Sequence, residues 1–512
     1  MDGRNLIGYR YSAKAQQIMQ ALDPKRQKFI EGQFNIATSE EMDAAVQLAQ
    51  QAHLQYQYCS GAQRAAFLRA IAEEILALDE PLIRRAMQES GLPEKRLIGE
   101  RGRTINQLQL FANMVEEGSW VEATLSDTIR KMLVPLGPVV VFTASNFPLA
   151  FSTAGGDTAS ALAAGCPVIV KAHESHLGTN ALVAYAIRKA AERCEMPEGV
   201  FSSLNGTGPE LGQALVNHPG VKAIAFTGSL RAGRAIFDAA SRRPEPIPVF
   251  AEMGSINPVI LTDGALNKRG EQLAKQLARS ITMGVGQFCT NPGLILAKES
   301  AMLDAFINQL SVNLQNSHSA TMLNEGVCKN YNQARQHLID TEGVKLEGLA
   351  AEPPKGQANA GLASIKGVDF LQKKNLQEEV FGPFSLVVRC SDDTELLAVI
   401  NSLSGQLTGT VMAEEEELAD QRGLINALRE RVGRLVFNGV PTGVAVCAAM
   451  QHGGPYPATT DSRTTSVGSS AIHRFARPVA YQDWPEAALP PALQQDNPLG
   501  IWRKIEESWQ KA

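Results

Sequence analysis

The sequence of 512 residues predicts an α/β protein with a parallel sheet covered by helices on both faces. Two observations lead to this fold class. Apolar residues recur at three- and four-residue spacing in the first third of the chain, which is typical of amphipathic helices. From residue 134 onward, short β-branched runs alternate with amphipathic segments, and such alternation forms parallel sheets. At roughly 150 residues per domain, the length indicates about three domains.

Helices are expected first along the chain. The helical spacing is clearest in Glu40–Gln57, Arg64–Ala77 and Leu97–Glu117, where Glu, Gln, Arg and Lys separate the apolar positions. Pro93 and Gly118 lie just outside the third segment, as residues at helix boundaries often do. The first third of the chain is therefore predicted to be helical.

Strands and helices then alternate. Val134–Thr143 is rich in β-formers and is interrupted by a Gly-Pro pair. Strands follow at Pro167–Val170 and Ala223–Phe226, and helices at Thr179–Cys194 and Ala232–Ala240. The later strand-like runs are, in order, Glu252–Leu261, the region of Ala297, Leu386–Arg389 and Leu435–Asn438.

Two segments fit neither pattern. Ala123–Met132 is a polar excursion between the helical part and the first strand region. The tail after His473 is rich in proline without being of low complexity. Such a tail more often wraps a surface or a partner subunit than forms a core.

Composition excludes several classes of protein. Lys and Arg number 48 against 53 Asp and Glu, a net charge of −5, which disfavours a nucleic-acid partner. Met1–Arg10 carries no export signal, and no apolar run reaches the roughly 18–20 residues that span a bilayer. Seven cysteines without CxxC spacing indicate neither a disulfide framework nor a structural zinc site. We expect a cytoplasmic protein without a membrane partner.

Several residues could carry chemistry, and each also has an ordinary structural interpretation. Cys289 follows two glycines in Gly284–Pro292, where exposed backbone N–H groups could activate a thiol, although a buried inert cysteine is commoner. The remaining cysteines lie in apolar or helical settings and are interpreted as structural. Thr227–Gly233 follows a strand and opens a helix, which suits phosphate binding but lacks the dinucleotide fingerprint.

Three polar residues follow predicted strands or turns. Glu252 comes directly after an apolar run, so its carboxylate is either paired, used or exposed in a loop. Asn146 follows another strand, where its amide could donate to an oxyanion or simply occupy a turn before proline. Glu379 has the same two interpretations.

Taken in order, these segments resemble the aldehyde dehydrogenase superfamily over nearly the whole chain. Six motifs carry the resemblance: Ser145–Pro148, Val168–Lys171, Phe226–Ser229, Glu252–Gly254, Gly286–Thr290 and Glu379–Pro383. The amino-acid sequences of Gly155–Pro167 and His452–Pro457 are similar to those of one branch of this superfamily. That branch contains bacterial α-ketoglutaric semialdehyde (2,5-dioxopentanoate) dehydrogenases and a fatty aldehyde dehydrogenase.

The resemblance implies a role for each matching residue. Cys289 is the nucleophile, Glu252 the general base, and Asn146 forms the oxyanion hole with the backbone N–H of Cys289. The residues implied in binding the cofactor, NAD or NADP, are Lys171, Glu174, Gly228, Ser229, Gly233, Glu379 and Phe381. No metal is implied in the reaction.

The cofactor prediction rests partly on two neighbouring positions. The family usually has proline after the cofactor-site lysine, whereas Ala172 follows Lys171 here. Glu174 lies where family members that use NAD often carry a carboxylate toward the ribose hydroxyls, and it should repel a 2′-phosphate. NAD is therefore favoured over NADP.

The family fold implies three parts. A Rossmann-type dinucleotide-binding domain is expected at 1–122 and 137–253, and an α/β catalytic domain at 254–470. A small β oligomerisation element is expected at 123–136 and 471–512, consistent with a homodimer or homotetramer. It accounts for the two segments that fitted neither pattern.

The branch predicts oxidation of 2,5-dioxopentanoate to 2-oxoglutarate, with fatty or other medium- and long-chain aldehydes as the alternative. Ala154 replaces an arginine that succinic semialdehyde dehydrogenases often use as a carboxylate anchor. We therefore expect Arg103, Gln107 and Phe147 to line the substrate site, although a solvated helix charge explains Arg103 almost as well. A CoA-acylating enzyme and a non-catalytic structural member remain open. Glu252 disfavours the first, which needs no base for water, and the presence of both Cys289 and Glu252 disfavours the second.

Overall fold

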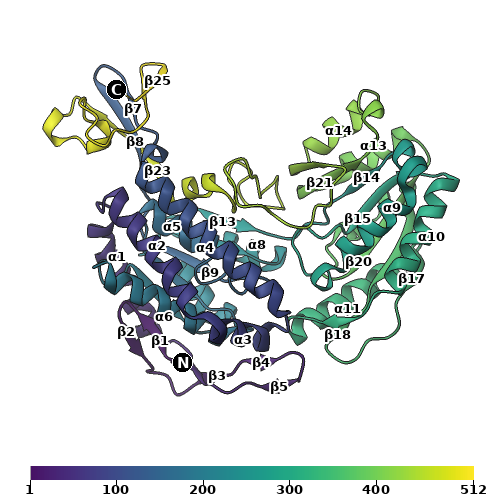
Figure 1. Ribbon diagram of the computed structural model, residues 1–512, viewed down its shortest axis with the longest axis horizontal. Coiled ribbons are helices and arrows are strands. Elements are labelled where there is room, and N and C mark those ends of the chain that lie inside the picture. The colour runs from purple at the N-terminus through teal and green to yellow at the C-terminus, as the bar shows by residue number, and fades with distance from the viewer. Residues whose placement is uncertain (1, 512) are drawn as a thin grey trace.

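Two large sheets and a smaller third sheet organise the chain, as Figure 1 shows for the computed structural model, which describes residues 2–511. The first sheet belongs to the N-terminal half and the second to the C-terminal half. The third stands away from both and carries the C-terminus. Within residues 2–511, no helix is both long enough and apolar enough to cross a bilayer.

The first sheet has the strand order β13-β12-β9-β10-β11-β1-β2. Its parallel strands are β9 (Val139–Phe142), β10 (Val168–Lys171), β11 (Phe201–Leu204), β12 (Ala223–Thr227) and β13 (Val249–Glu252). The antiparallel strands β1 (Asn5–Ile7) and β2 (Arg10–Ser12) extend it. Every residue of β9, β10 and β11 is buried, as expected for strands covered on both faces.

Helices cover both faces of this sheet. Alternate residues of β9 explain the layering: Val139 and Val141 pack into one apolar cluster, and Val140 packs into the other. The first cluster is closed by α2 (Gly61–Ala77), α4 (Glu94–Glu117), α5 (Gly156–Ala164) and α6 (Leu177–Arg193). The second is closed by α1 (Ser39–Tyr56), α7 (Gln213–Asn217) and α8 (Leu230–Ser241). A short helix, α3 (Asp79–Ser90), joins α2 to α4.

The carboxyl ends of the parallel strands meet along one edge of the first sheet. In register, Phe142 pairs with Lys171 and with Phe226, and Thr227 pairs with Glu252. Ligands of open α/β sheets bind outside this edge. The segments after β9, β10, β12 and β13 therefore all open toward one region.

The second sheet has the order β17-β19-β20-β15-β14-β21-β22. Its parallel strands are β14 (Val259–Leu261), β15 (Leu294–Lys298), β19 (Gly361–Lys366), β20 (Phe384–Cys390), β21 (Gln406–Met412) and β22 (Val432–Phe437), with β17 (Lys345–Leu349) antiparallel at the edge. On one face lie α9 (Asp263–Thr282) and α10 (Ala301–Gln315). On the other lie α11 (Glu325–Ile339), α12 (Gly367–Gln372), α13 (Asp393–Ser402) and α14 (Arg422–Arg429).

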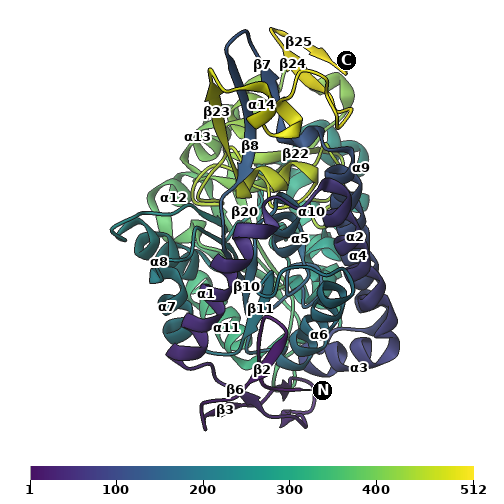
Figure 2. The same ribbon diagram turned by 90° about the vertical axis from the view of Figure 1, so that its left-hand side faces the viewer.

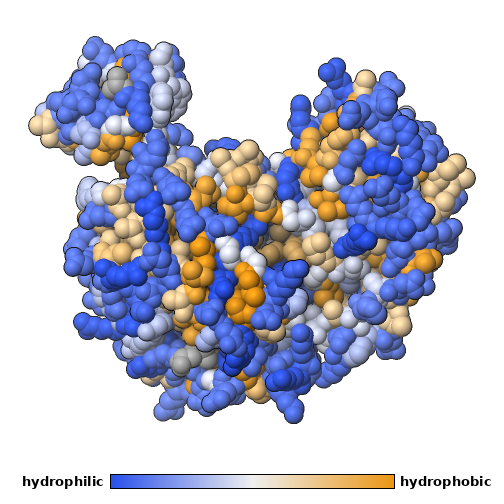
Figure 3. All heavy atoms as spheres, in the orientation of Figure 1, coloured by the Kyte–Doolittle hydropathy of each residue, from blue (hydrophilic) through white to orange (hydrophobic). Residues whose placement is uncertain are grey.

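The third sheet, which we call the arm, has the order β23-β8-β7-β24-β25. Its strands are β7 (Thr124–Leu125), β8 (Ile129–Pro135), β23 (Ala476–Gln482), β24 (Arg503–Ile505) and β25 (Ser508–Gln510). It projects from the top of the molecule in Figure 2, and Figure 3 shows a notch between it and the body. Its strands and the segments that flank them expose the large apolar side chains Ile129, Trp484, Leu499, Trp502 and Trp509.

The three helices expected in the first third are confirmed, each beginning one to three residues earlier than expected. The prediction that this third is helical is wrong for its first part. Six short strands, two or three residues each, lie between residues 5 and 35: β1, β2, β3 (Ile18–Met19), β4 (Leu22–Asp23), β5 (Lys28–Phe29) and β6 (Phe34–Asn35). Strands of that length are too short for any periodicity to be visible in the sequence.

Candidate active site

Cys289 lies in the loop between α9 and β15, and glycines shape that loop. Gly284, Val285 and Gly286 all have positive φ angles, of 55°, 59° and 65°. A Cβ atom on Gly286 would lie 2.2 Å from the carbonyl carbon of Gly382, so only glycine fits there. The loop can therefore lie directly against the segment that precedes β20, which fixes the position of the thiol.

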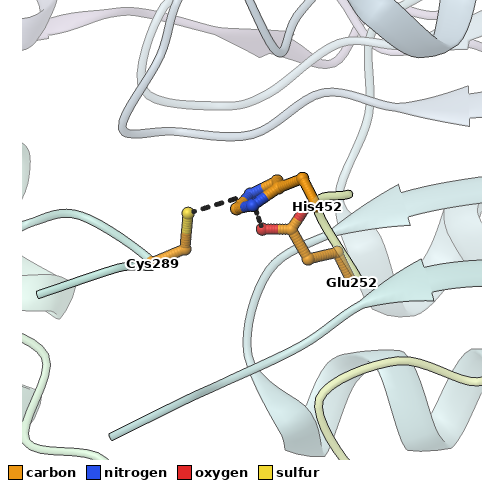
Figure 4. A group of neighbouring side chains, drawn as sticks. All are labelled: Glu252, Cys289 and His452. Carbon is orange, nitrogen blue, oxygen red and sulfur yellow. Dashed lines mark hydrogen bonds and ion pairs between the residues drawn. The ribbon is translucent and has the colours of Figure 1, made fainter. Parts of the chain in front are cut away.

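The thiol of Cys289 faces an imidazole and a carboxylate, as Figure 4 shows. Its Sγ atom is 3.5 Å from Nε2 of His452. The same nitrogen is 2.9 Å from Oε1 of Glu252. Glu252 and His452 are buried, whereas Cys289 is partly exposed, so the thiol is the accessible member of the group.

A distant loop brings His452 to Glu252. Residues 458–460 pair with the end of β13: the N–H of Met253 donates to the carbonyl of Ala458, and the N–H of Thr460 donates to the carbonyl of Ala251. Within the loop, the N–H of His452 donates to Oγ1 of Thr465 at 2.8 Å. The chain between residues 452 and 466 therefore closes over the carboxyl end of the first sheet.

A hydroxyl from the same loop holds the other carboxylate oxygen. Oγ of Ser466 donates a hydrogen bond of 2.6 Å to Oε2 of Glu252. Burial opposes ionisation of Glu252, but His452 and the hydrogen bond from Ser466 outweigh it and keep the pKa of this carboxyl below its usual value. Glu252 is therefore an ionised base at neutral pH.

The pKa of the Cys289 thiol is shifted in the opposite direction to that of Glu252. Burial, together with the carboxylate of Glu252, raises the pKa of the Cys289 thiol well above its usual range. The resting state is consequently a protonated thiol beside an ionised carboxylate. A proton can pass from sulfur to the carboxylate when Sγ forms a bond to an electrophile.

Asn146 lies at the opposite side of the thiol loop, in the turn after β9. Its Nδ2 donates to the carbonyl of Gln287 at 3.2 Å, which joins the two halves of the molecule close to Cys289. The second hydrogen of that amide remains available. Among residues 2–511, the backbone N–H of Cys289 has no hydrogen-bond acceptor either.

Two side chains of α4 hold the turn that contains Asn146. Nη2 of Arg96 donates to the Asn146 carbonyl at 2.8 Å, and its guanidinium lies over the rings of Phe147 and Phe288, 4.9 and 4.7 Å from their centroids. Glu100 accepts hydrogen bonds from the next backbone N–H groups, those of residues 149 and 150, at 2.8 and 3.0 Å. The amide of Asn146 is thus fixed by contacts that its own motif does not contain.

Arg103 lies one helical turn further along α4 and faces the same region. Its guanidinium is 5.4 Å from the ring centroid of Phe151 and interacts electrostatically with Cys289 and Glu252. Its Nη1 donates to the carbonyl of Val444. Its Nε and Nη2 are buried, and neither has a hydrogen-bond partner within the described chain. Two donors of a charged group are therefore available to an anion.

The other two expected substrate residues lie nearby. Phe147 is half-buried and stacks against Phe151 and Phe288, with centroids 5.1 and 5.4 Å away. Gln107 is buried with its amide against the backbone of Gly156, so it contacts the start of α5. A contact between Gln107 and a substrate stays a prediction.

A second arginine shares the loop that Arg103 contacts. Arg434, on β22, donates to the carbonyls of Pro441 and Gly443 at 2.7 and 3.1 Å. Its charge also interacts with Cys289. Residues 441–444 are thus held by two cations next to the thiol.

Lys171 and Glu174, expected at the cofactor, form a pair at the end of β10. Nζ of Lys171 is buried and lies 2.8 Å from Oε1 of Glu174. The N–H of Gly208 donates to the same oxygen at 3.1 Å. Burial opposes ionisation of Glu174, but Lys171 outweighs it and keeps the pKa of the carboxyl below its usual value. A negative charge therefore lies at this edge of the sheet.

The turn between β12 and α8 presents an exposed helix N-terminus. Ser229 caps α8 by accepting from the N–H of Ala232. The N–H of Gly228 donates to the carbonyl of Glu252 at 3.1 Å, so the turn adjoins the base directly. A Cβ on Gly233 would lie 2.6 Å from Met253, which explains the glycine by close packing.

Glu379 and Phe381 line a small cavity under the thiol loop, together with Ser255 and Phe288. A Cβ on Gly254 would lie 2.6 Å from Oε2 of Glu379. Burial raises the pKa of Glu379 to about 8, with Glu252 contributing in the same direction. This carboxyl is accordingly mostly protonated at neutral pH.

Reasoning from the sequence missed four contributors: His452, Ser466, Arg96 and Arg434. His452 lies in the segment His452–Pro457, whose sequence resembles one branch of the superfamily, but that resemblance implied no chemical role for the histidine. The other three have no local motif. One structural interpretation also needs correction, because Cys447 was expected in an apolar or helical setting and is instead exposed in the loop after β22.

Comparisons with known proteins identify the family. The model of the aldehyde dehydrogenase family matches residues 11–475. Alpha-ketoglutaric semialdehyde dehydrogenase 2 of Azospirillum brasilense is 48% identical over 98% of this chain and 98% of its own. Alpha-ketoglutaric semialdehyde dehydrogenase of Acinetobacter baylyi is 45% identical over 92% of each chain.

Solved structures share the fold. A 1-pyrroline-5-carboxylate dehydrogenase from Thermus with bound NAD superposes with a TM-score of 0.80 at 23% identity, covering 93% of this chain and 92% of the other. A mutant of aldehyde dehydrogenase C from Pseudomonas syringae, in complex with NAD+ and octanal, gives 0.82 at 20% identity, covering 95% and 98%. The resemblance of the six sequence motifs is confirmed: the chain belongs to the aldehyde dehydrogenase family and is an oxidoreductase that acts on aldehydes.

Proposed function

We propose that this enzyme oxidises 2,5-dioxopentanoate to 2-oxoglutarate with NAD, through a thioester on Cys289. The two relatives named for α-ketoglutaric semialdehyde, at 48% and 45% identity, support this substrate. The observation that carries it in the structure is Arg103, whose two buried and unpartnered donors lie beside the thiol. A substrate with a carboxylate at the end opposite its aldehyde would accept hydrogen bonds from both of these donors.

The first chemical step follows from the charges around Cys289. Sγ attacks the aldehyde carbon while the thiol proton passes to Glu252, directly or through Nε2 of His452, which lies between them. The negative charge that develops on the aldehyde oxygen meets the free amide hydrogen of Asn146 and the N–H of Cys289. Bound NAD would accept the hydride that leaves the aldehyde carbon.

The second step is hydrolysis of the resulting thioester. Glu252, once it has released the thiol proton, accepts a proton from water as the water attacks the acyl carbon. Ser466 and His452 hold its two oxygens, so the carboxylate is oriented toward the reacting atoms. Hydrolysis needs a base that deprotonates the attacking water, whereas transfer of the acyl group to CoA does not, so the presence of Glu252 favours hydrolysis.

Recognition of the substrate rests on opposite charges in a partly buried site. A carboxylate that accepts from Nε and Nη2 of Arg103 would form charge-assisted hydrogen bonds at the distal end. Phe147 and Phe151 supply the apolar wall between that end and the thiol. A long-chain aldehyde would leave the two donors of Arg103 buried and unpaired, which disfavours the fatty-aldehyde alternative.

Residues for a dinucleotide are present at the edge of the first sheet. The exposed N-terminus of α8 at Ser229, after Gly228, suits a pyrophosphate, and Lys171 with Glu174 suits ribose hydroxyls. Glu379 and Phe381 would hold the second ribose from the other half. The negative charge of Glu174 favours NAD over NADP, because it repels a 2′-phosphate.

Assembly and location extend the same proposal. The arm carries exposed tryptophans at 484, 502 and 509, which suit contacts between subunits of a homodimer or homotetramer. Seven cysteines in 512 residues, without paired spacing, favour a reducing compartment such as the cytoplasm.

The test is a panel of kcat/KM values for 2,5-dioxopentanoate, glutaric semialdehyde and a long-chain aldehyde, with and without CoA. The native chain should prefer 2,5-dioxopentanoate, without dependence on CoA. Arg103→Ala should raise KM for this substrate by roughly 10- to 100-fold, the worth of a charged hydrogen-bonded pair, while little changes for a long-chain aldehyde. Lys95→Ala, an exposed cation on the same helix, is the matched control. Equal KM values for native chain and Arg103→Ala would refute the anchor.

A further inference from the structure

The atoms that surround the thiol are also a set of metal ligands. Sγ of Cys289, Nε2 of His452 and a carboxylate oxygen of Glu252 all lie within 4.8 Å of one another. Two of the separations are 3.5 Å, sulfur to nitrogen, and 2.9 Å, nitrogen to oxygen. Figure 4 shows the three side chains converging from three different segments.

Their chemistry and spacing suit zinc. Thiolate, imidazole and carboxylate are the donors that Zn²⁺ takes in proteins, at roughly 2.3 Å for sulfur and roughly 2.0–2.2 Å for nitrogen and oxygen. A tetrahedral ion at those distances holds its ligand atoms about 3.3–3.6 Å apart. The separation of Sγ and Nε2, 3.5 Å, already matches that geometry, and the separation of Nε2 and Oε1, 2.9 Å, would have to lengthen by about 0.4 Å.

We propose that Cys289, His452 and Glu252 form a three-ligand site for Zn²⁺ that reversibly blocks the enzyme. The fourth position of the ion would remain for water, as in zinc sites with three protein ligands. Because Cys289 is partly exposed, a cation can reach the site from solvent. The ligands lie at positions 252, 289 and 452, too far apart in the sequence to form a recognisable metal-binding motif.

Charge balance favours the bound state. Binding breaks the S–H bond of Cys289, forms an S–Zn bond and releases the thiol proton to solvent, with no change of oxidation state. The proton that Nε2 of His452 shares with Glu252 also leaves this nitrogen, to Nδ1 of the same ring or to solvent. The thiolate and the carboxylate of Glu252 together neutralise the two positive charges of the ion. Nε2 of His452 donates its lone pair, so its proton is carried on Nδ1.

The consequence for catalysis is direct. The lone pair of sulfur that attacks the aldehyde is engaged by the metal, and the base is engaged as well. Inhibition should therefore compete with the aldehyde and should be reversed by a chelator. The same coordination should protect the thiol from alkylation, since the thiolate is the reactive form.

The experiment uses the full-length enzyme, freed of metal, and titrates it with Co²⁺ and with chelator-buffered Zn²⁺. Co²⁺ reports the ligands by its thiolate charge-transfer absorption and tetrahedral visible bands, independently of activity. We expect one Co²⁺ per chain, displaced by Zn²⁺, with a thiolate band. Cys289→Ser should abolish that band, and His452→Gln should weaken the affinity at least about tenfold.

Two further variants make the result specific. Cys447→Ser removes an exposed thiol outside the site and should leave the Co²⁺ spectrum and affinity unchanged. Glu252→Gln should weaken binding without removing the band, because the sulfur remains. Circular dichroism of each variant separates loss of a ligand from loss of the fold.

Three outcomes would overturn the site: no thiolate band in the native enzyme, a band that survives Cys289→Ser, or an affinity that His452→Gln leaves unchanged. The spectra need no substrate. Failure of the metal site is therefore distinct from failure of the proposed substrate, which the kinetic panel tests separately.

Discussion

Ser466 donates a hydrogen bond of 2.6 Å to Oε2 of Glu252, across 214 positions of the sequence. The other oxygen of that carboxylate faces His452 at 2.9 Å. A buried carboxylate held in this way stays ionised and keeps one orientation, and both properties are needed in a base. The relationship predicts how the pH dependence of the enzyme responds to substitution.

Ser466→Ala should move the acidic limb of the kcat profile to higher pH. The base works when it is deprotonated, so activity falls as the pH drops through its pKa. Loss of a hydrogen bond that lowers the pKa of Glu252 raises that pKa, so the acidic limb moves to higher pH. The measurement is kcat between pH 5 and 9, with Ser469→Ala, a partly exposed serine nearby in sequence, as the control. An unshifted limb would show that Ser466 does not act on the base.

Cys289→Ser and Glu252→Gln should separate the two chemical steps. The first variant should reduce no cofactor, because a serine hydroxyl is a far poorer nucleophile than a thiol and is much harder to deprotonate, even beside Glu252 and His452. The second should give a burst of at most about one reduced cofactor per site, followed by turnover slowed roughly 10²–10⁴-fold. If Glu252 also takes the thiol proton, the burst itself becomes smaller.

Mass spectrometry of Glu252→Gln completes that experiment. The acyl group should be found on Cys289 and on none of the other six cysteines. Turnover of Glu252→Gln at the native rate would place the base elsewhere.

Glu174→Gln should relax the preference between cofactors. Removing the charge that repels a 2′-phosphate should raise the ratio of kcat/KM for NADP to that for NAD by about tenfold. The matched control is Glu210→Gln, which removes an exposed carboxylate two residues after Gly208. A native enzyme that already prefers NADP would contradict the assignment of Glu174.

Glu379 should make the thermal stability of the enzyme without cofactor depend on pH. Its pKa is about 8 in the fold, above the value of a free carboxyl, so the folded state holds the proton more tightly than the unfolded chain. This contribution to stability is complete below about pH 4.5 and is lost as the pH rises to about 8. Glu379→Gln should therefore lose less Tm between pH 5 and 9 than the native enzyme.

The control for that experiment is Glu378→Gln, which changes the exposed neighbour of Glu379. Its Tm should follow the native curve over the same pH range. Equal slopes for Glu379→Gln and the native enzyme would show that Glu379 titrates normally.

Local motifs allowed much of the fold and part of the site to be predicted. Strand ends and glycine turns are local features, so Cys289, Glu252 and Asn146 were candidates from their neighbours, and the ordered set of six motifs implied their roles. The family-model match and the solved structures confirm the family and the α/β class. Helix periodicity located α1, α2 and α4 to within three residues.

The remainder depends on contacts between distant segments. His452 reaches Glu252 because residues 458–460 pair with β13, and nothing within either segment specifies that pairing. Arg96 stands in no motif of the sequence, yet its guanidinium lies over two aromatic rings and donates to the turn of Asn146. Such roles follow from tertiary packing, which periodicity does not encode.

The pairing of β8 with β23 joins residues 129–135 to residues 476–482. During synthesis on the ribosome, β8 emerges long before β23 exists, and the N-terminal sheet can fold while β8 has only the two-residue strand β7 beside it. The loop that supplies His452 and Ser466 is also made late. A truncated nascent chain therefore has neither a complete arm nor a complete catalytic group, so release of the finished polypeptide, rather than folding of the first sheet, sets the moment at which activity begins.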